Sequence, residues 1–183
     1  EGAGVNKEVG SGITIMSYAG ITAQDVAPHS IDIFHQASIA QVQTNFETKT
    51  CGTTLIIAGN NTAPVVAPLT NYTIPRSTPF ALTGSASDAN GDPLTYTWEQ
   101  NDNGIAATTG TASVASATKT AGPNWISFRP TTSPTRYFPQ LSTILTGGYV
   151  TGPLPGGDVG ANIEALSSVA RTLNFRLTVR DNA

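Results

Sequence analysis

The sequence predicts a mainly β protein, an antiparallel β-sandwich preceded by a short helical segment. Apolar side chains alternate with polar ones at period two near the C-terminus, where Leu173, Phe175, Leu177 and Val179 share one face. Glycine, proline, asparagine and aspartate separate other short apolar runs at the spacing expected of a sandwich. The chain has 183 residues, 39% of them hydrophobic, so it can bury a core.

One helix is predicted, followed by strands. The helix lies at about residues 30–46, where Pro28 and the N-cap residue Ser30 precede apolar side chains at helical spacing. Two further pieces, 134–139 and 163–171, contain enough apolar residues to pack onto the sandwich. Short apolar and alternating runs predict strands at 53–57, 81–86, 94–99, 125–129 and 173–180.

These elements divide the chain into three parts. Residues 1–50 carry the helix, residues 51–63 are a linker, and residues 64–183 form the sandwich. A long irregular insertion, rich in proline and glycine, spans about residues 130–165 of the third part. A connection of that length in a compact domain is either functional or loosely ordered.

Composition excludes some classes of partner. The formal net charge is −3 and the pI is about 5.2, so the basic patch that neutralises phosphates is missing and we expect no nucleic acid partner. No apolar run approaches the ~20 residues of a membrane span. Charged residues make up only 11% of the chain, and small polar residues are in surplus, which is typical of a secreted bacterial β-protein.

The start of the chain and its one cysteine indicate that a longer protein precedes it. Residue 1 is Glu1 and no secretory leader follows, so we expect any signal peptide to have been removed or to lie outside this segment. Cys51 has no second cysteine to pair with. It has therefore either lost a disulfide partner upstream or serves as a small buried apolar residue.

The most informative motif is the turn GSGITIMSYAG at residues 10–20, which contains the only methionine, Met16. It resembles the Met-turn of metzincin zinc proteases, which lies beneath the metal. In that superfamily, zinc is held by the histidines of HExxHxxGxxH, a motif absent from this chain. His29 and His35 both follow the turn; we expect His35 to be a structural residue of the helix and His29 to lie at the surface. The resemblance implies that the zinc ligands lie upstream and that Met16 forms the floor of their site.

A series of motifs extends this resemblance over nearly the whole chain. After the turn come a helix that begins with SxxxFH and then the motifs CGT, GNxxP, TIPxxTPF, DxNGDPLTYxWE, PTRYFP and RxLxFRxTVRD. Together they resemble the second half of large secreted reprolysin-like metallopeptidases of marine and Bacteroidetes-type bacteria. The resemblance implies a parent hydrolase that cleaves peptide bonds, partners consisting of the upstream protease half and a peptide or protein substrate, and no activity for this chain alone. Residues 20–30 would form one wall of the S1′ pocket.

Tyr18, two residues after the methionine, has two interpretations. In astacin- and serralysin-type relatives, a tyrosine at this position ligates zinc or donates a hydrogen bond to the oxyanion of the tetrahedral intermediate. Reprolysins usually lack this tyrosine, so the family and the catalytic role point in different directions. The alternative is an aromatic residue that packs with its hydroxyl satisfied.

A second candidate metal site lies in the segment SDANGDPLTYTW, which resembles PKD-, cadherin- and fibronectin-like domains, members of the Ig-like sandwich class. In those folds the tryptophan, here Trp98, packs between the sheets. Asp88, Asn90 and Asp92 offer the hard oxygen ligands that calcium requires. The candidates that complete the set are Asp181, Glu99 and Asp102. The alternative is turn chemistry without a metal, because Asn-Gly-Asp-Pro is itself a strong turn signal.

A different class of function also fits these residues. The chain would then be a non-catalytic extracellular adhesion or carbohydrate-binding module, with Trp125, Tyr137 and Tyr149 as candidates for an exposed aromatic face. Under either function, the helix at the front carries apolar side chains that need cover. We expect Ile31, Phe34 and Ile39 to pack on the sandwich or to mediate self-association.

Overall fold

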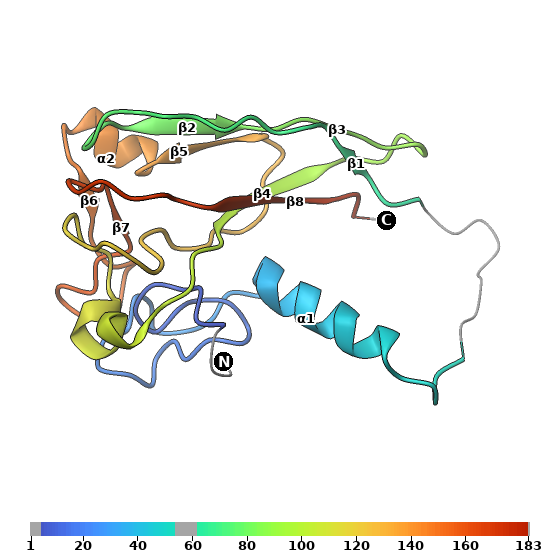
Figure 1. Ribbon diagram of the computed structural model, residues 1–183, viewed down its shortest axis with the longest axis horizontal. Helices are drawn as coiled ribbons and strands as arrows, with labels where there is room; N and C mark the ends of the chain where they lie inside the picture. Colours follow the sequence, from blue (N-terminus) through green and yellow to red (C-terminus); the bar gives the residue numbers. More distant parts are fainter. Residues whose placement is uncertain (1–4, 54–61, 183) are drawn as a thin grey trace.

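The computed structural model describes residues 5–53 and 62–182, and its described strands are all antiparallel (Figure 1). The mainly β class is therefore confirmed. The described strands form four separate two-stranded sheets, so the finer prediction of an Ig-like sandwich stays a prediction. The predicted strand at 53–57 falls almost entirely outside the described residues. The elements are α1 (Gln36–Glu47), β1 (Val65–Val66), β2 (Phe80–Thr83), β3 (Ala86–Ser87), β4 (Thr95–Gln100), β5 (Thr135–Phe138), α2 (Leu141–Leu145), β6 (Val150–Thr151), β7 (Glu164–Ala165) and β8 (Phe175–Arg180).

Two pairs of strands form the body of the molecule. β4 pairs with β8, with Trp98 opposite Leu177, and β2 pairs with β5, with Phe80 opposite Phe138. The predicted strands at 94–99 and 173–180 are thus confirmed with small shifts of their ends. On β8, Leu177 is buried and Arg176 exposed, as the period-two pattern requires.

An aromatic core lies between these two sheets. It contains Trp98, Trp125, Phe138, Leu166 and Leu177, with the ring of Phe80 stacked on that of Phe138 at a centroid distance of 4.8 Å. The prediction that Trp98 packs between the sheets is confirmed. Its indole nitrogen donates to the carbonyl of Pro134 at 3.0 Å, which satisfies the one polar atom of this buried side chain.

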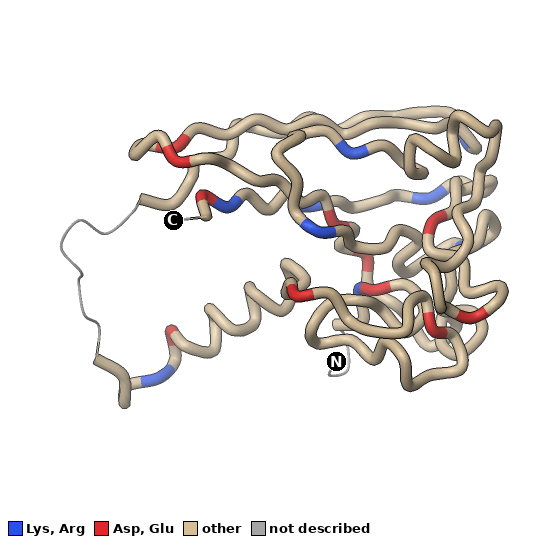
Figure 2. The backbone as a smooth tube through the Cα atoms, turned by 180° about the vertical axis from the view of Figure 1, so that it is seen from behind, with Lys and Arg blue, Asp and Glu red and all other residues tan. Residues whose placement is uncertain are grey.

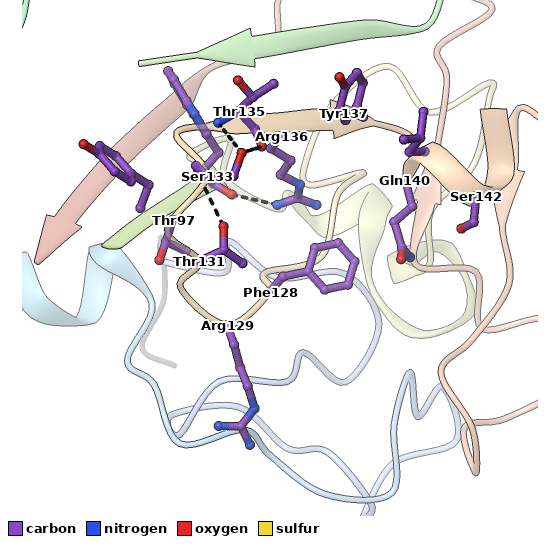
Figure 3. A pocket seen from close by; sticks show the side chains of 13 residues that line it. Thr97, Phe128, Arg129, Thr131, Ser133, Thr135, Arg136, Tyr137, Gln140 and Ser142 are labelled. Carbon is purple, nitrogen blue, oxygen red and sulfur yellow. Dashed lines mark hydrogen bonds between the residues drawn. The ribbon is translucent and has the colours of Figure 1, made fainter. Parts of the chain in front are cut away.

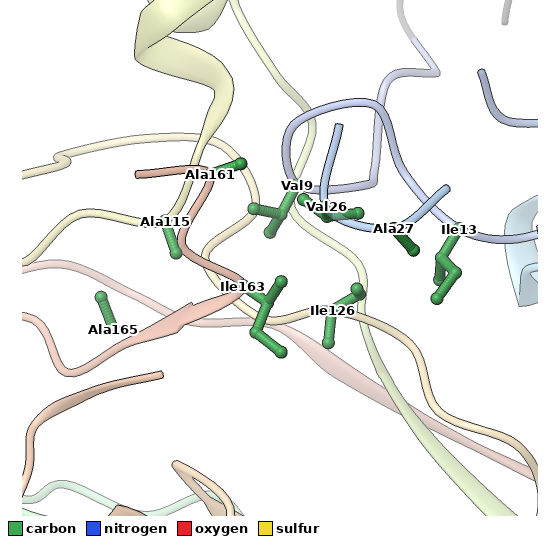
Figure 4. Packing of buried hydrophobic residues seen from close by; sticks show 9 residues of the cluster. All are labelled: Val9, Ile13, Val26, Ala27, Ala115, Ile126, Ala161, Ile163 and Ala165. Carbon is green, nitrogen blue, oxygen red and sulfur yellow. The ribbon is translucent and has the colours of Figure 1, made fainter. Parts of the chain in front are cut away.

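A second core is aliphatic and consists of nine buried residues (Figure 4). Trp125 points into the aromatic core, whereas its neighbour Ile126 belongs to the aliphatic one. Ala165 and Leu166 divide between the two cores in the same way. These two stretches therefore form a middle layer that is buried on both faces. The aliphatic core comprises Val9, Ile13, Val26, Ala27, Ala115, Ile126, Ala161, Ile163 and Ala165.

The predicted strand at 125–129 is wrong, because only Trp125 of this stretch takes part in a β-bridge and side chains bind other backbone groups nearby. Trp125 makes only an isolated bridge with Glu164. The amide of Asn124 donates to the side chain of Gln100 at 2.6 Å, and the carbonyl of Ile126 accepts from a guanidinium group. Backbone pairing of this stretch with residues 163–165 is limited to two hydrogen bonds, from the amide of Ile126 to the carbonyl of Ile163 at 3.0 Å and from the amide of Ala165 to the carbonyl of Asn124 at 3.2 Å.

Helix α1 exists as predicted but begins at Gln36, six residues after the predicted N-cap Ser30. Residues 31–33 instead lie alongside residues 13–15, with the amide of Ile31 donating to the carbonyl of Ile13 at 2.7 Å. The actual N-cap is His35, whose Nδ1 accepts from the amide of Ala37. His35 is therefore structural, as expected, and His29 is exposed.

Apolar side chains at the front meet the predicted packing only in part. Ile31 packs against the aliphatic core, as predicted, while Phe34 is 42% exposed and Ile39 is half-buried. Self-association through this region stays a prediction. The region predicted as an irregular insertion contains β5, α2, β6 and β7, and its pieces 134–139 and 163–171 pack as predicted, because Phe138 and Ile163 are fully buried.

One buried ion pair joins the layers. The guanidinium of Arg136 on β5 donates to the carbonyls of Trp98 and Ile126 and to the carboxylate of Glu164, at 2.7, 2.6 and 2.8 Å. The side chains of Arg136 and Glu164 are 11% and 0% exposed. Burial lowers the pKa of Arg136, and the charge of Glu164 opposes that shift. The other carboxylate oxygen of Glu164 accepts from the amide of Gln140 at 2.8 Å, immediately before α2.

The substitution Arg136→Met is expected to lower the free energy of unfolding by about 3–5 kcal/mol, because Glu164 would stay buried without its partner. Urea denaturation followed by tryptophan fluorescence measures this loss, since both tryptophans lie in the aromatic core. Arg129→Met is the matched control. Arg129 pairs with Asp32 at the surface, and a loss below about 1 kcal/mol is expected there. Equal losses in the two variants would contradict the special role of the buried pair.

A second buried cation, Lys119, binds both ends of the loop at residues 113–123. Its ammonium group donates to the carbonyls of Ser113, Val114 and Pro123 at 2.7, 3.1 and 2.8 Å. Burial, and to a lesser extent the charge of Arg171, lowers the pKa of Lys119 to about 8. The loop therefore depends on an amine whose charge changes within an accessible pH range.

The lowered pKa predicts how stability changes with pH. Between about 8, the folded pKa of Lys119, and 10.5, its ordinary value, the unfolded chain binds more protons, so this group makes stability rise with pH. The difference in unfolding free energy between the wild type and Lys119→Met should rise by up to about 1 kcal/mol per pH unit from pH 8 to 10. Urea titrations at each pH test this. A difference that is flat or falls with pH counts against the shift.

Candidate functional site

The turn that contains Met16 is tightly hydrogen-bonded. The amide of Gly12 donates to the carbonyl of Val9 at 2.8 Å, and the amide of Tyr18 donates to the carbonyl of Ser11 at 2.9 Å. Gly10 has a φ of 58°, and a Cβ there would lie 2.7 Å from the carbonyl oxygen of Gln24. Only glycine fits this position, because it combines a left-handed backbone with a close approach of another segment.

A buried carboxylate shapes the turn from inside. Glu8 is 4% exposed, and its Oε1 accepts from the amides of Ile13 and Thr14 at 2.9 and 3.0 Å. Its Oε2 accepts from the hydroxyl of Thr14 at 2.7 Å. Sequence analysis missed Glu8. The signal that could have found it is an acidic residue immediately ahead of a glycine-rich turn, where free amides need an acceptor.

The side chains singled out for catalysis are both exposed on this turn. Met16 is 52% and Tyr18 54% exposed. Ile15 and Ile21 are exposed beside them, and hydrogen bonds from Ile15 to Ile33 and from Ile21 to Tyr18 join the segments involved. We call this surface the apolar face; its residues are Ile15, Met16, Tyr18, Ile21 and Phe34.

Zinc does not fit the residues in hand. Across 5–53 and 62–182, no group of three histidine, cysteine, aspartate or glutamate side chains is placed to hold a metal ion. His29 is exposed, and His35 is occupied as a helix cap. No step of zinc chemistry is therefore assigned to the described residues.

The candidate calcium loop is organised by turn chemistry. Oδ1 of Asp88 accepts from the amides of Asn90 and Asp92 at 2.8 and 3.0 Å, and Oδ1 of Asn90 accepts from the amide of Thr62 at 3.0 Å. Oδ2 of Asp88 is buried and has no hydrogen-bond partner among residues 5–53 and 62–182. Asp181 directly follows β8, one residue after Arg180, which lies opposite Thr95. Calcium binding by Asp88, Asn90, Asp92 and Asp181 stays a prediction.

Two other calcium candidates have structural roles instead. Glu99 is fully buried, and its carboxylate accepts from the amide of Gln36 and the hydroxyl of Ser127 at 3.0 and 2.9 Å. Asp102 accepts from Asn174. Glu99 thus meets the amide of the first residue of α1, where a negative charge stabilises a helix.

The aromatic residues proposed for a binding face differ in exposure. Trp125 is 2% exposed, so its assignment to an exposed face is wrong; it lies in the aromatic core because the middle layer is buried on both faces. Tyr137 and Tyr149 are 43% and 57% exposed. Cys51 is exposed, which excludes the interpretation of a small buried apolar residue.

A cleft of about 380 Å³ lies between β4, β5 and the start of α2. Figure 3 shows the hydroxyl-bearing side chains of Thr131 and Ser133 on one side and Gln140 on the other. Arg136 lies over the ring of Phe128, 4.7 Å from its centroid. The guanidinium covers one face of this ring, whereas Tyr137, which also lines the cleft, is 43% exposed.

Comparison with known protein families, curated proteins and solved structures gave no match to this chain. No helix in the described ranges has both the length and the apolar character needed to cross a membrane. Figure 2 shows the charged residues spread along the chain without a long run of either sign. The geometry of the turn and the sequence motifs are therefore the features of this chain that bear on its function.

The substitution Glu8→Ala is expected to destabilise the protein by roughly 2–4 kcal/mol, because it leaves two buried amides and a hydroxyl without an acceptor. Thermal and urea denaturation measure this loss. Glu47→Ala, at the exposed end of α1, is the control and should change stability by less than about 0.5 kcal/mol. If the two variants were equally stable, Glu8 could not be the residue that shapes the turn.

Proposed function

We propose that this chain is the C-terminal part of a secreted zinc metalloendopeptidase of the metzincin class. The observation that carries the proposal is the hydrogen-bonded turn on which Met16 and Tyr18 are 52% and 54% exposed. Glu8 and left-handed glycines hold this turn in place. A well-ordered turn with an apolar outer surface is the expected form of a floor beneath another part of the same site.

The apolar face supports the proposal from the side of energetics. Ile21 is 77% exposed, and the other members of the face are between 42% and 54% exposed. Large exposed apolar patches mark interaction sites in soluble proteins. We assign its cover to the protease residues that precede this chain, which would also supply the three histidines and the general base.

Each part of the chain then has a role in the proposal. Met16 is the floor of the metal site, and Tyr18 is either a ligand of the metal or a hydrogen-bond donor to the oxyanion. Residues 20–30 form a wall of the S1′ pocket. The β module, residues 64–182, is an Ig-like domain that binds substrate or stabilises the protease, with calcium as its candidate ion.

The test uses a longer polypeptide that includes the residues preceding Glu1. It should contain HExxHxxGxxH and hydrolyse a peptide substrate, and 1,10-phenanthroline should abolish this activity. Tyr18→Phe should lower kcat by roughly 100-fold with little change in KM, because it removes a donor that acts in the transition state. Tyr72→Phe is the control, since Tyr72 is 71% exposed in the β module.

Two outcomes would contradict the proposed function. The first is a preceding sequence without a histidine trio. The second is a longer polypeptide that contains the trio but shows the same activity before and after the metal is chelated.

A further inference from the structure

The loop at residues 152–160 of the β module lies directly against the described residues 5–50, which we call the front segment. The amide of Asp158 donates to the carbonyl of Asp25 at 2.7 Å, and the amide of Asp25 donates to Oδ2 of Asp158 at 2.8 Å. The amide of Leu154 donates to the carbonyl of Val26 at 3.0 Å. Three hydrogen bonds thus connect residues that are more than a hundred positions apart in the sequence.

The contact is too close for side chains to intervene. A Cβ at Gly157 would lie 2.7 Å from the carbonyl oxygen of Val26 and 2.8 Å from that of Asp25. Both atoms belong to the backbone and cannot rotate away, as the end of a side chain could. Val26 itself is fully buried in the aliphatic core beside Ile163.

From this contact, hydrogen bonds lead step by step to the candidate site. Oδ1 of Asp25 accepts from the amide and the hydroxyl of Thr22 at 3.1 and 2.7 Å. The amide of Val26 donates to the hydroxyl of Ser11 at 3.2 Å, and the carbonyl of Ser11 accepts from the amide of Tyr18. The position of Tyr18 is therefore linked to the loop through Ser11 and Val26.

Other contacts fix the front segment at both ends. The amide of Gly10 donates to the carbonyl of Ser113 at 3.1 Å. The side chain of Gln36 donates to that of Asn101 at 2.6 Å, beside the bond from its amide to Glu99. The front segment and the β module share one core and a continuous set of hydrogen bonds.

We infer that the loop at residues 152–160 is a positioning element for residues 20–28, which makes the β module a built-in part of the proposed peptidase site. Gly157 and Asp158 are its positioning residues. This inference depends on the proposed function for its catalytic meaning, while the structural coupling stands on the contacts alone. It predicts that changes in this loop alter which substrate side chain is accepted beside the turn.

The test compares Gly157→Ala with Gly152→Ala, a change in the same loop where an added Cβ meets nothing within 4 Å. In the 183-residue chain, Gly157→Ala should raise amide hydrogen exchange in residues 11–28 by about 10-fold and leave β4 and β8 unchanged. Gly152→Ala should exchange like the wild type. Asp158→Ala, which keeps the backbone and removes one acceptor, is a second variant in case Gly157→Ala does not fold.

In the longer polypeptide, the same variants should lower kcat/KM and change the preference for the substrate residue after the cleaved bond. Unchanged exchange in residues 11–28 of both Asp158→Ala and Gly157→Ala would overturn the inference. Altered exchange with an unaltered substrate preference would also overturn its catalytic part. If the longer polypeptide has no metal-dependent activity, the proposed function fails, and hydrogen exchange still decides whether the loop positions the segment.

Discussion

The architecture depends on the buried pair of Arg136 and Glu164. A guanidinium group cannot be removed from water without acceptors, and here they come from a carboxylate and from the carbonyls of Trp98 and Ile126. These acceptors belong to β4, β7 and the stretch after Trp125, while the arginine itself is on β5. Four separate pieces of chain must therefore meet at one point. No single two-stranded sheet of this protein could specify that arrangement by its own hydrogen bonds.

The middle layer transmits this constraint to the front of the molecule. Arg136 donates a hydrogen bond to the carbonyl of Ile126, and the side chain of Ile126 lies on the opposite face, in the aliphatic core. Val9 and Val26 pack in that same core and flank the turn that carries Met16. A charge pair in the aromatic half of the protein thus helps to place an exposed turn in the other half. The ion pair and the turn are connected by static side-chain packing, without a conformational change.

Sequence patterns predicted the elements whose partners are local or periodic. Period two on β8 and the burial of Trp98 follow from side-chain chemistry alone, and glycines around Met16 were enough to predict the turn. The predicted start of α1 was wrong because backbone hydrogen bonds hold residues 31–33 against residues 13–15. The spacing of the apolar residues fits a helix and an extended segment equally well. Arg136 was missed because two of its acceptors are backbone carbonyls, and no side-chain pattern records where a carbonyl will be. For Glu8, the one signal was an acidic residue immediately ahead of a glycine-rich turn.

The coupling between turn and β module has a physical reason. A glycine-rich turn is flexible on its own, because glycine loses more conformational freedom on folding than other residues. Presenting Met16 and Tyr18 in a fixed geometry therefore needs support from outside the turn. Glu8 supplies part of it from within the front segment, and the loop around Gly157 supplies the rest from the β module. Under the proposed function, a turn that is already ordered loses less conformational entropy when the preceding protease residues pack on it. This favours a single chain that contains the turn and the β module over two chains that associate transiently.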